Sequence, residues 1–370
     1  MKKRTLITKL IFGLNVLAAI ALLLSYAAAY IKPDPFWPIA FFGLAFPYLL
    51  GLNFIFLLLW TFKGSTKLFL PLIVISLGYK TIPAFVQLHF DESNEQEDHI
   101  KVMSFNVRVF DLYMWTKEKT TRNQIFQFLD REDPDILCLQ EFYHSDKQDV
   151  YEFKTLDTLK QFLSAKNYHF HATSTLRKTD HWGVITFSKY PIKAKGLVPF
   201  ASRGDNVCTY TDIVKDDRIM RVYNAHLASI KLDKHDYKAI KAVNENQYSD
   251  DFGKELLVLS KVKAGFIHRS QQADSIRKHL DQSPFPSILM GDFNDTPASY
   301  AYHKIKGGKM QDAFRQAGSG LGLTYIGDFP SFRIDYILHD STFKAIDYHT
   351  HPEELSDHHP ISASLVMKPL

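Results

Sequence analysis

Polar residues that can bind a cation, hold a phosphate or move a proton follow a series of short apolar runs in the second part of this sequence. These residues are Asn106, Gln140 and Glu141, Asn224 and His226, Asp292 and Asn294, Asp335, and Asp357 with His358. Carboxylate oxygens suit magnesium or manganese, and a carboxylate beside an imidazole fixes the ring and keeps it charged. The carboxyl ends of strands are where α/β proteins place function. The pattern therefore predicts one site assembled from several strand ends.

The motifs around these residues occur in a recognisable order. They include Leu-Gln-Glu ending at Glu141, Asn-Ala-His-Leu around His226, Gly-Asp-Phe-Asn around Asp292 and Ser-Asp-His ending at His358. Together with Asn106 and Asp335, the motifs resemble the endonuclease/exonuclease/phosphatase (DNase I-like) superfamily over about residues 100–370. The resemblance implies a four-layered α/β sandwich, with two central sheets flanked by helices. It also implies hydrolysis of a phosphoester by water.

The resemblance assigns a metal-binding role to three residues. Glu141 is expected to be the main ligand of Mg²⁺ or Mn²⁺, with help from Asn106 and Asp357. Many family members carry an acid two residues after the Asn, where this chain has Arg108. The arginine is expected to pair with Glu141 or to contact phosphate.

The remaining residues receive catalytic or phosphate-binding roles from the same resemblance. Asp292 is expected to orient or deprotonate the attacking water, and His226 to protonate the leaving oxygen. Asp335 is expected to orient His358, which stabilises the charge that builds on the phosphate. The side chains expected to bind the substrate phosphate are those of Asn106, Asn224 and Asn294.

Strand-like and helical segments alternate around these residues, which favours an α/β layered domain. Strands are predicted at 99–105, 135–140, 181–188, 207–214, 219–226, 287–290, 334–339 and 361–366. Helices are predicted at 123–129, 152–163 and about 233–280. The segment 233–275 exceeds the connection usual in the family, and its apolar stripe fits either core packing or contact with a membrane.

The first ninety residues predict an all-α transmembrane module of about three helices. Apolar stretches at about 10–31, 36–62 and 68–90 each approach the ~20 residues that a bilayer crossing needs. A cleaved signal peptide is the alternative for the first stretch. The basic N-terminus and the basic loop near 63–67 are expected inside the cell, which places the catalytic domain outside the cytoplasm. An acidic linker at 91–99 separates this module from the domain at 100–370.

The charge is distributed unevenly. The chain has a net charge of +4, but residues 1–90 hold eight Lys or Arg and one acid, so the rest of the chain is slightly acidic. A dedicated nucleic-acid binder carries its positive charge on the docking domain, which this chain does not do in bulk. Of the two cysteines, Cys138 lies in an apolar run and is expected to be a buried thiol.

The reaction class is better defined by these patterns than the substrate. A nucleic-acid phosphodiester is the first possibility, which would make the protein a membrane-tethered nuclease. A membrane-lipid phosphodiester or phosphomonoester is the second, favoured by the anchor, the acidic domain and His226. A non-enzymatic binding module would not need the complete set of polar residues. No obligate protein partner is indicated.

Overall fold

The computed structural model describes residues 2–89, 98–147, 153–201, 206–230, 252–327 and 330–369. Most of the predicted linker and the first part of the predicted helix at 233–280 lie outside these ranges. The chain divides into two compact units. One contains residues 1–79, 228–273 and 298–303, and the other contains residues 80–227, 274–297 and 304–370.

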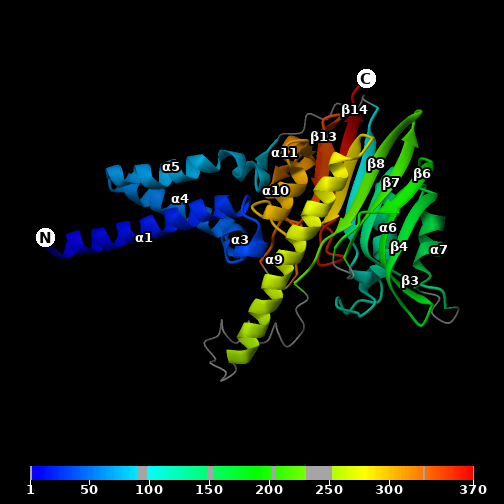
Figure 1. Cartoon of the computed structure of the whole chain (residues 1–370), viewed down its shortest axis with the longest axis horizontal. Helices are drawn as coiled ribbons and strands as arrows, with labels where there is room; N and C mark the ends of the chain where they lie inside the picture. Colours follow the sequence, from blue (N-terminus) through cyan, green and yellow to red (C-terminus); the bar gives the residue numbers. More distant parts are fainter. Residues whose placement is uncertain are drawn as a thin grey trace. The chain divides into compact units, whose positions relative to one another are not determined.

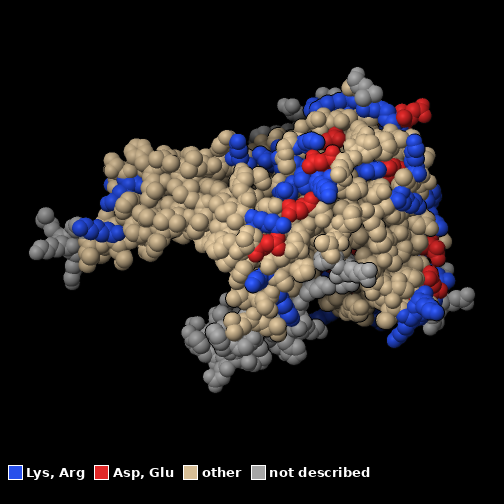
Figure 2. Space-filling model, in the orientation of Figure 1, with Lys and Arg blue, Asp and Glu red and all other residues tan. Residues whose placement is uncertain are grey.

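The first unit is helical and contains most of the N-terminal apolar sequence. Its helices are α1 (Lys2–Ala28), α2 (Pro33–Phe36), α3 (Ile39–Leu44), α4 (Phe46–Phe62), α5 (Phe69–Leu77) and the first part of α9 (Phe252–Asp281). A 3₁₀ turn, η1 (Thr66–Leu68), leads into α5. Helices α1, α4 and α5 run side by side (Figure 1). Their exposed surface carries few charged side chains away from the helix ends (Figure 2).

The helix lengths differ from the three crossings that the sequence predicts. Among the described residues, only the stretch Leu6–Ala28 of α1 is long and apolar enough to cross a bilayer, and a signal sequence would meet the same criterion. The second stretch is divided into α3 and the 17-residue α4, with α2 ending at its start, because Pro38 and Pro47 lack the amide hydrogen that a continuous helix requires. In the third stretch, α5 has nine residues and is followed by the 3₁₀ turns η2 (Gly78–Lys80) and η3 (Ile82–Ala84).

Polar side chains connect α1 to α4 inside this unit. Trp60 Nε1 donates to Asn15 Oδ1 at 3.0 Å, and Asn53 Nδ2 donates to the carbonyl of Ala18 at 3.0 Å. All three side chains are buried. Hydrogen bonds between small polar groups are a common means of holding helices together where the surroundings are apolar.

The second unit is built on two six-stranded sheets of described residues. The first sheet has the order β13 (Phe343–Thr350), β14 (Ile361–Met367), β2 (Ile100–Asn106), β3 (Ile136–Ser145), β5 (Asp180–Ser188) and β4 (Asn167–Leu176). The second has the order β10 (Met310–Asp312), β12 (Asp335–Asp340), β9 (Ser287–Asp292), β8 (Arg218–His226), β7 (Val207–Lys215) and β6 (Ile192–Leu197). A short pair, β1 (Gln87–Leu88) with β11 (Ser319–Gly320), lies apart from them.

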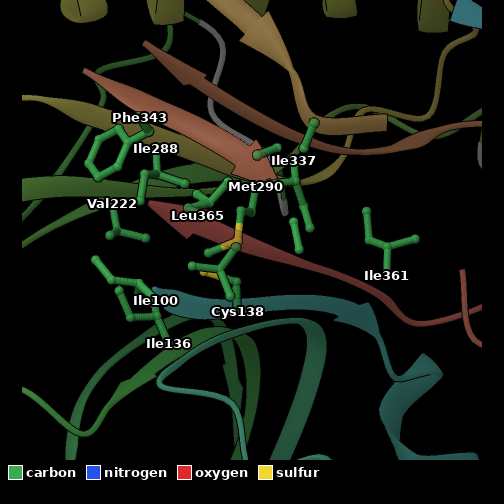
Figure 3. Close-up of a cluster of buried hydrophobic side chains, with 14 of the residues drawn as sticks. Ile100, Ile136, Cys138, Val222, Ile288, Met290, Ile337, Phe343, Ile361 and Leu365 are labelled. Atoms are coloured by element: carbon green, nitrogen blue, oxygen red, sulfur yellow. The ribbon is translucent and has the colours of Figure 1, made fainter. Parts of the chain in front are cut away.

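An apolar core lies between the two sheets. Ile136 and Cys138 of β3 pack in one cluster with Val222, Ile288 and Met290 from the other sheet, as Figure 3 shows. Cys138 is therefore a buried thiol, as predicted. The cluster contains β-branched and other apolar residues at alternate strand positions, which is the pattern of a strand with one face on a core.

Helices cover the outer faces of the sheets. Helix α6 (Thr121–Glu132) packs through Ile125 and Phe128 on the first sheet, and α7 (Thr155–Phe162) adds Leu159. The last turns of α9 contact the second sheet, where Tyr223 Oη and His279 Nδ1 lie 2.9 Å apart. The short helices α10 (Tyr300–Lys306) and α11 (Ala313–Ala317) follow β9 and β10. The predicted four-layered α/β sandwich is thus confirmed.

Candidate active site

Two pairs of parallel strands bring the predicted site residues together. Strands β2 and β3 are parallel in the first sheet, where Asn106 lies opposite Gln140. Strands β8 and β9 are parallel in the second sheet, where His226 lies opposite Asp292. Strand β12 places Asp335 on the other side of Asp292. Because the carboxyl ends of parallel strands meet at one edge, residues far apart in the sequence become neighbours.

The amide of Asn106 joins the two sheets at this edge. Its Nδ2 donates to Asp292 Oδ2 at 3.1 Å and to Glu141 Oε1 at 3.3 Å. Its Oδ1 accepts from the backbone N–H of Arg108 at 3.1 Å. Asn106 is buried, so these bonds fix its side chain and hold the two carboxylates close to each other.

A β-bulge in β3 turns Glu141 into the site. The pairing with β5 shifts between Leu139 and Phe142, and Glu141 has a left-handed φ of 49°. Gly183 lies opposite Phe142, where a Cβ would stand 1.9 Å from the carbonyl oxygen of His171. The glycine is therefore required for close strand packing beside the bulge, and the bulge re-aims the side chain of Glu141.

The surroundings of Glu141 disfavour its ionised form. Burial raises the pKa of this carboxyl, and the nearby carboxylate of Asp357 raises it further, although the imidazolium of His358 opposes the rise. The side chain still keeps 37% of its surface exposed, so it can be reached from solvent. A cation beside Glu141 would favour the ionised form.

Asp292 lies at the end of β9 with its carboxylate almost fully enclosed. Its Oδ1 accepts from the backbone N–H of Asn294 at 2.7 Å, and its Oδ2 accepts from the Asn294 side chain at 3.2 Å. Burial raises the pKa of Asp292 to about 6. The preceding Gly291 has a φ of 139°, and a Cβ there would stand 1.9 Å from the carbonyl oxygen of Ala225. The Gly-Asp pair therefore needs its glycine for the close approach of β8 and β9.

Asn294 lies next to Asp292 in a left-handed turn with a φ of 52°. Besides its bonds to Asp292, its Nδ2 donates to the carbonyl of Leu227 at 3.0 Å. The residue is partly exposed at the edge of the group. The structure thus brings Asn294 to the site, where its phosphate contact stays a prediction.

His358 and Asp335 form a buried pair on the far side of Asp292. His358 Nδ1 lies 2.9 Å from Asp335 Oδ2, and His358 Nε2 lies 3.8 Å from Asp292 Oδ2. Burial by itself would lower the pKa of His358, but the carboxylates of Asp335 and Asp292 outweigh it and raise the pKa to about 10. The ring is therefore an imidazolium at neutral pH, with Nε2–H directed toward the centre of the site.

His226 completes the group from β8. Its Nε2 lies 3.8 Å from both Glu141 Oε1 and Asp292 Oδ2. The ring therefore faces the same space as the two carboxylates. Its role as the proton donor to a leaving oxygen stays a prediction.

Asp357 is already engaged with a cationic side chain. Its Oδ2 lies 3.3 Å from Arg108 Nε, and its Oδ1 lies 3.2 Å from Ser356 Oγ. The sequence predicts that Arg108 pairs with Glu141 or contacts phosphate. In the structure its ion pair is with Asp357 instead of Glu141. The metal-binding role of Asp357 stays a prediction, and the ion pair weakens the case for it.

Asn224 is not part of the group. It is fully buried between the sheets, where its Nδ2 donates to the carbonyl of Ile185 at 2.9 Å and its Oδ1 accepts from Gln140 Nε2 at 2.8 Å. Asn224 and His226 share one face of β8, but Asn224 lies two residues deeper in the sheet. Its hydrogen bonds favour a structural role over the phosphate contact that the sequence predicts for it.

Two residues that support the site had no assigned role in the sequence prediction. Thr324 Oγ1 accepts from the backbone N–H groups of Ile334 and Asp335 at 3.0 and 3.1 Å. Ser356 Oγ donates to the carbonyl of Asn106 at 2.8 Å, which attaches the segment before β14 to the end of β2. Ser356 stands in the Ser-Asp-His motif, whereas no sequence signal marks Thr324.

The donor set fits a divalent cation beside Glu141. The four carboxylates of the group face two cationic side chains, Arg108 and His358, which leaves a formal excess of two negative charges. Asp292, Asp335 and His358 also have ligand atoms within 4.8 Å of one another. However, Asp335 is paired with His358 at 2.9 Å, and Asp292 accepts hydrogen bonds from Asn106 and Asn294. Glu141, whose side chain keeps 37% of its surface exposed, is therefore the carboxylate better placed to hold a cation.

Comparison with known families agrees with this geometry. A model of the endonuclease/exonuclease/phosphatase family matches residues 103–358, and a model of a domain of unknown function matches residues 8–85. Because the first match spans more than half of the sequence, the chain belongs to the endonuclease/exonuclease/phosphatase family. The protein is thus a hydrolase of the phosphoesterase and nuclease type. No curated protein sequence matches the chain.

Solved structures share the fold at low sequence identity. An endonuclease/exonuclease/phosphatase from Beutenbergia cavernae has a TM-score of 0.52 and 16% identity, over 73% of this chain and 72% of that chain. A family protein from Bacteroides thetaiotaomicron has a TM-score of 0.52 and 18% identity, over 74% and 100%. The human Nocturnin catalytic domain with bound sulfate has a TM-score of 0.51 and 17% identity, over 74% and 98%.

Proposed function

We propose that the protein is a divalent-metal-dependent phosphodiesterase, held at a membrane by its N-terminal helices, and that its substrate is a nucleic acid. The observation that carries the reaction is the bridge made by Asn106. Its amide holds Asp292 and Glu141 together, while His226 and His358 approach the same carboxylate from either side at 3.8 Å. A base, an acid and a phosphate-stabilising cation thus surround one point.

Each side chain has a separate part in the proposed reaction. Asp292, with a pKa of about 6, takes a proton from the attacking water. The imidazolium of His358, oriented by Asp335, stabilises the charge that grows on the phosphoryl oxygens. His226 protonates the oxygen that leaves.

Glu141 and Asn106 would hold Mg²⁺ or Mn²⁺, with help from Asp357, whose ion pair with Arg108 is kept. The cation would neutralise charge on the phosphoryl oxygens. Asn106 and Asn294 would orient the phosphate.

The first test is a substrate screen with full-length protein in detergent. Bis(p-nitrophenyl) phosphate, single- and double-stranded DNA, RNA, and vesicles of sphingomyelin or phosphatidylinositol would be incubated with Mg²⁺ or Mn²⁺. Cleavage of nucleic acid supports the proposal. If only the lipid vesicles were hydrolysed, the proposed substrate would change from nucleic acid to lipid, and the proposed reaction class would stand.

Glu141→Gln is expected to lower turnover by more than about 100-fold and to weaken Mn²⁺ binding, because a hard cation loses its main carboxylate. Turnover would be measured with bis(p-nitrophenyl) phosphate, and the Mn²⁺ dissociation constant by electron paramagnetic resonance. Glu118→Gln, an exposed carboxylate outside the group, is the matched control. Full activity of the wild type in excess chelator would exclude a metal-dependent reaction.

A membrane lipid is the second candidate substrate. The observation that favours it is the apolar stretch Leu6–Ala28, which is long enough to cross a bilayer and so to keep the protein at its lipid substrate.

The proposed arrangement is a multi-pass anchor in residues 1–90, followed by a catalytic domain outside the cytoplasm. The match of a separate family model to residues 8–85 supports treating the N-terminal part as its own domain.

The proposed topology predicts the behaviour of reporter fusions. Alkaline phosphatase fused after Glu95 is expected to be active, because that enzyme folds only outside the cytoplasm. The same reporter fused after Gly64, in the basic loop, is expected to be inactive. If a reporter that works only in the cytoplasm were active after Glu95, the proposed orientation would be wrong.

A further inference from the structure

Arg108 is held in an unusual backbone segment beside the site. Residues Arg108–Asp111 all have left-handed φ values, between 41° and 56°, although none is glycine. Such a conformation is unfavourable for L-residues, and it persists only where the surroundings impose it. The segment begins two residues after Asn106, whose Oδ1 accepts from the backbone N–H of Arg108.

Packing and hydrogen bonds hold this segment in place. Phe110 is buried between Phe126 and Phe142, with ring centroids 5.6 and 5.5 Å away. The carboxylate of Asp111 accepts from the backbone N–H of Trp115 at 2.7 Å and also from the hydroxyl of Thr116. The loop is therefore anchored at both ends, and its position is determined by contacts inside the domain.

The loop presents the guanidinium of Arg108 on an aromatic surface. The guanidinium carbon lies 4.4 Å from the centroid of the Trp115 ring, and Tyr113 packs against the same ring at 5.1 Å. Both rings are exposed, Tyr113 to 61% and Trp115 to 40%. Arg108 Nε pairs with Asp357 at 3.3 Å. Stacking and the ion pair fix the plane of the guanidinium.

The two terminal amino groups of Arg108 are not used by these contacts. Across the parts of the chain that the structure describes, its side chain contacts Trp115 through the ring face and Asp357 through Nε. The Arg108 side chain is 30% exposed. A planar guanidinium with two free donors and little freedom of rotation matches two oxygens of a phosphate.

We propose that Arg108, held flat by Trp115, binds a second anionic group of the substrate next to the scissile phosphate. This inference rests on the proposed phosphodiesterase function and defines its substrate class more narrowly. The second group would be a neighbouring phosphate, which either an oligonucleotide or a phosphorylated lipid headgroup supplies. Trp115 acts as a positioning residue, since it orients the guanidinium and leaves the contact with substrate to Arg108.

The test compares substrates that differ in one phosphate. Full-length protein with saturating Mn²⁺ would be given the dinucleotide TpT and its 5′-phosphorylated form pTpT. In a parallel arm, it would be given vesicles of phosphatidylinositol or of phosphatidylinositol 4-phosphate. The arm in which the wild type prefers the phosphorylated substrate identifies the source of the second phosphate.

Arg108→Ala is expected to reduce the preference in kcat/KM for the phosphorylated substrate by roughly 10- to 100-fold, mainly through KM, because a hydrogen-bonded charge pair is lost. Arg108→Lys should recover little of it, because an ammonium cannot stack or pair at two points. Trp115→Leu should weaken the preference, and Trp115→Phe should restore most of it. Arg218→Ala, at the opposite end of β8, is the control and should leave the preference unchanged.

A binding measurement separates this inference from the proposed function. Dissociation constants of pTpT and TpT, measured by calorimetry, should differ in the wild type and converge in Arg108→Ala, even where no diester is hydrolysed. If the wild type hydrolysed both substrates and Arg108→Ala lowered kcat/KM equally for both, the inference about Arg108 would be wrong. The proposed phosphodiesterase function would stand. If the protein hydrolysed no diester but still bound pTpT more tightly than TpT, the proposed function would be wrong and the inference about Arg108 would stand.

Discussion

Replacing His358 with Ala is expected to lower turnover by roughly 10²–10⁴, the range for a positioned catalytic group. The residue lies 2.9 Å from Asp335 through Nδ1, and the pKa of its ring is raised to about 10. The variant would lose the imidazolium that faces the growing charge on the phosphate. Turnover of bis(p-nitrophenyl) phosphate would be measured, with circular dichroism to confirm that the variant is folded.

A double-mutant cycle tests whether His358 and Asp335 act as one unit. Asp335→Asn alone should cost somewhat less than His358→Ala, because the ring stays but loses its orientation and charge. The double variant should be little worse than His358→Ala, since residues that act together are not additive. Losses that simply multiply would show that the two residues act independently. His359→Ala is the matched control, because His359 Nδ1 lies 3.2 Å from the carbonyl of Glu353, outside the group.

The sequence was sufficient to predict the central strands because each combines apolar alternation with a polar residue at its end. The segments predicted at 219–226 and 287–290 correspond to β8 and β9, and the prediction for 207–214 corresponds to β7. Edge strands were missed. Strand β4 alternates poorly, and β6 is mostly exposed, so neither carries the hydrophobic pattern on which such a prediction depends.

The sequence was enough to predict that residues lie together where a residue's position along its strand determines its neighbours. His226, Asp292 and Asp335 occupy adjacent register positions in the second sheet, so three strand ends were enough to place them together. The sequence did not show that Asn224 is buried deeper than His226, because alternation defines the face of a strand but not the depth at which a second sheet covers it.

Contacts that depend on irregular backbone could not be predicted from the sequence. The direction of the Glu141 side chain depends on a bulge in the pairing of β3 with β5, a strand distant in the sequence. The pairing of Arg108 with Asp357 depends on a loop with left-handed φ values. The N-terminal module shows the same limitation. Hydropathy identified its apolar stretches, whereas the positions of Pro38 and Pro47 determine where the helices begin and end.

Replacing Asp292 with Asn is expected to lower turnover by roughly 10²–10⁴ and to remove the acidic limb of the pH–rate profile. Burial raises the pKa of Asp292 to about 6, so part of the wild-type protein carries a protonated Asp292 in mildly acidic solution. A base acts only when it is deprotonated. On its acidic side the rate should therefore rise as the pH increases toward 6, and a bound cation would move this limb to lower pH.

The profile of kcat/KM would be measured between about pH 4.5 and 9 with saturating Mn²⁺, since this ratio reports the ionisation of the free enzyme. Asp216→Asn, an exposed carboxylate on the turn between β7 and β8, should leave the profile unchanged. If the residual activity of Asp292→Asn kept the same acidic limb, a different group would be the base. Glu141 would then be the next group to test, because Asn106 links it to Asp292 and its own pKa is raised.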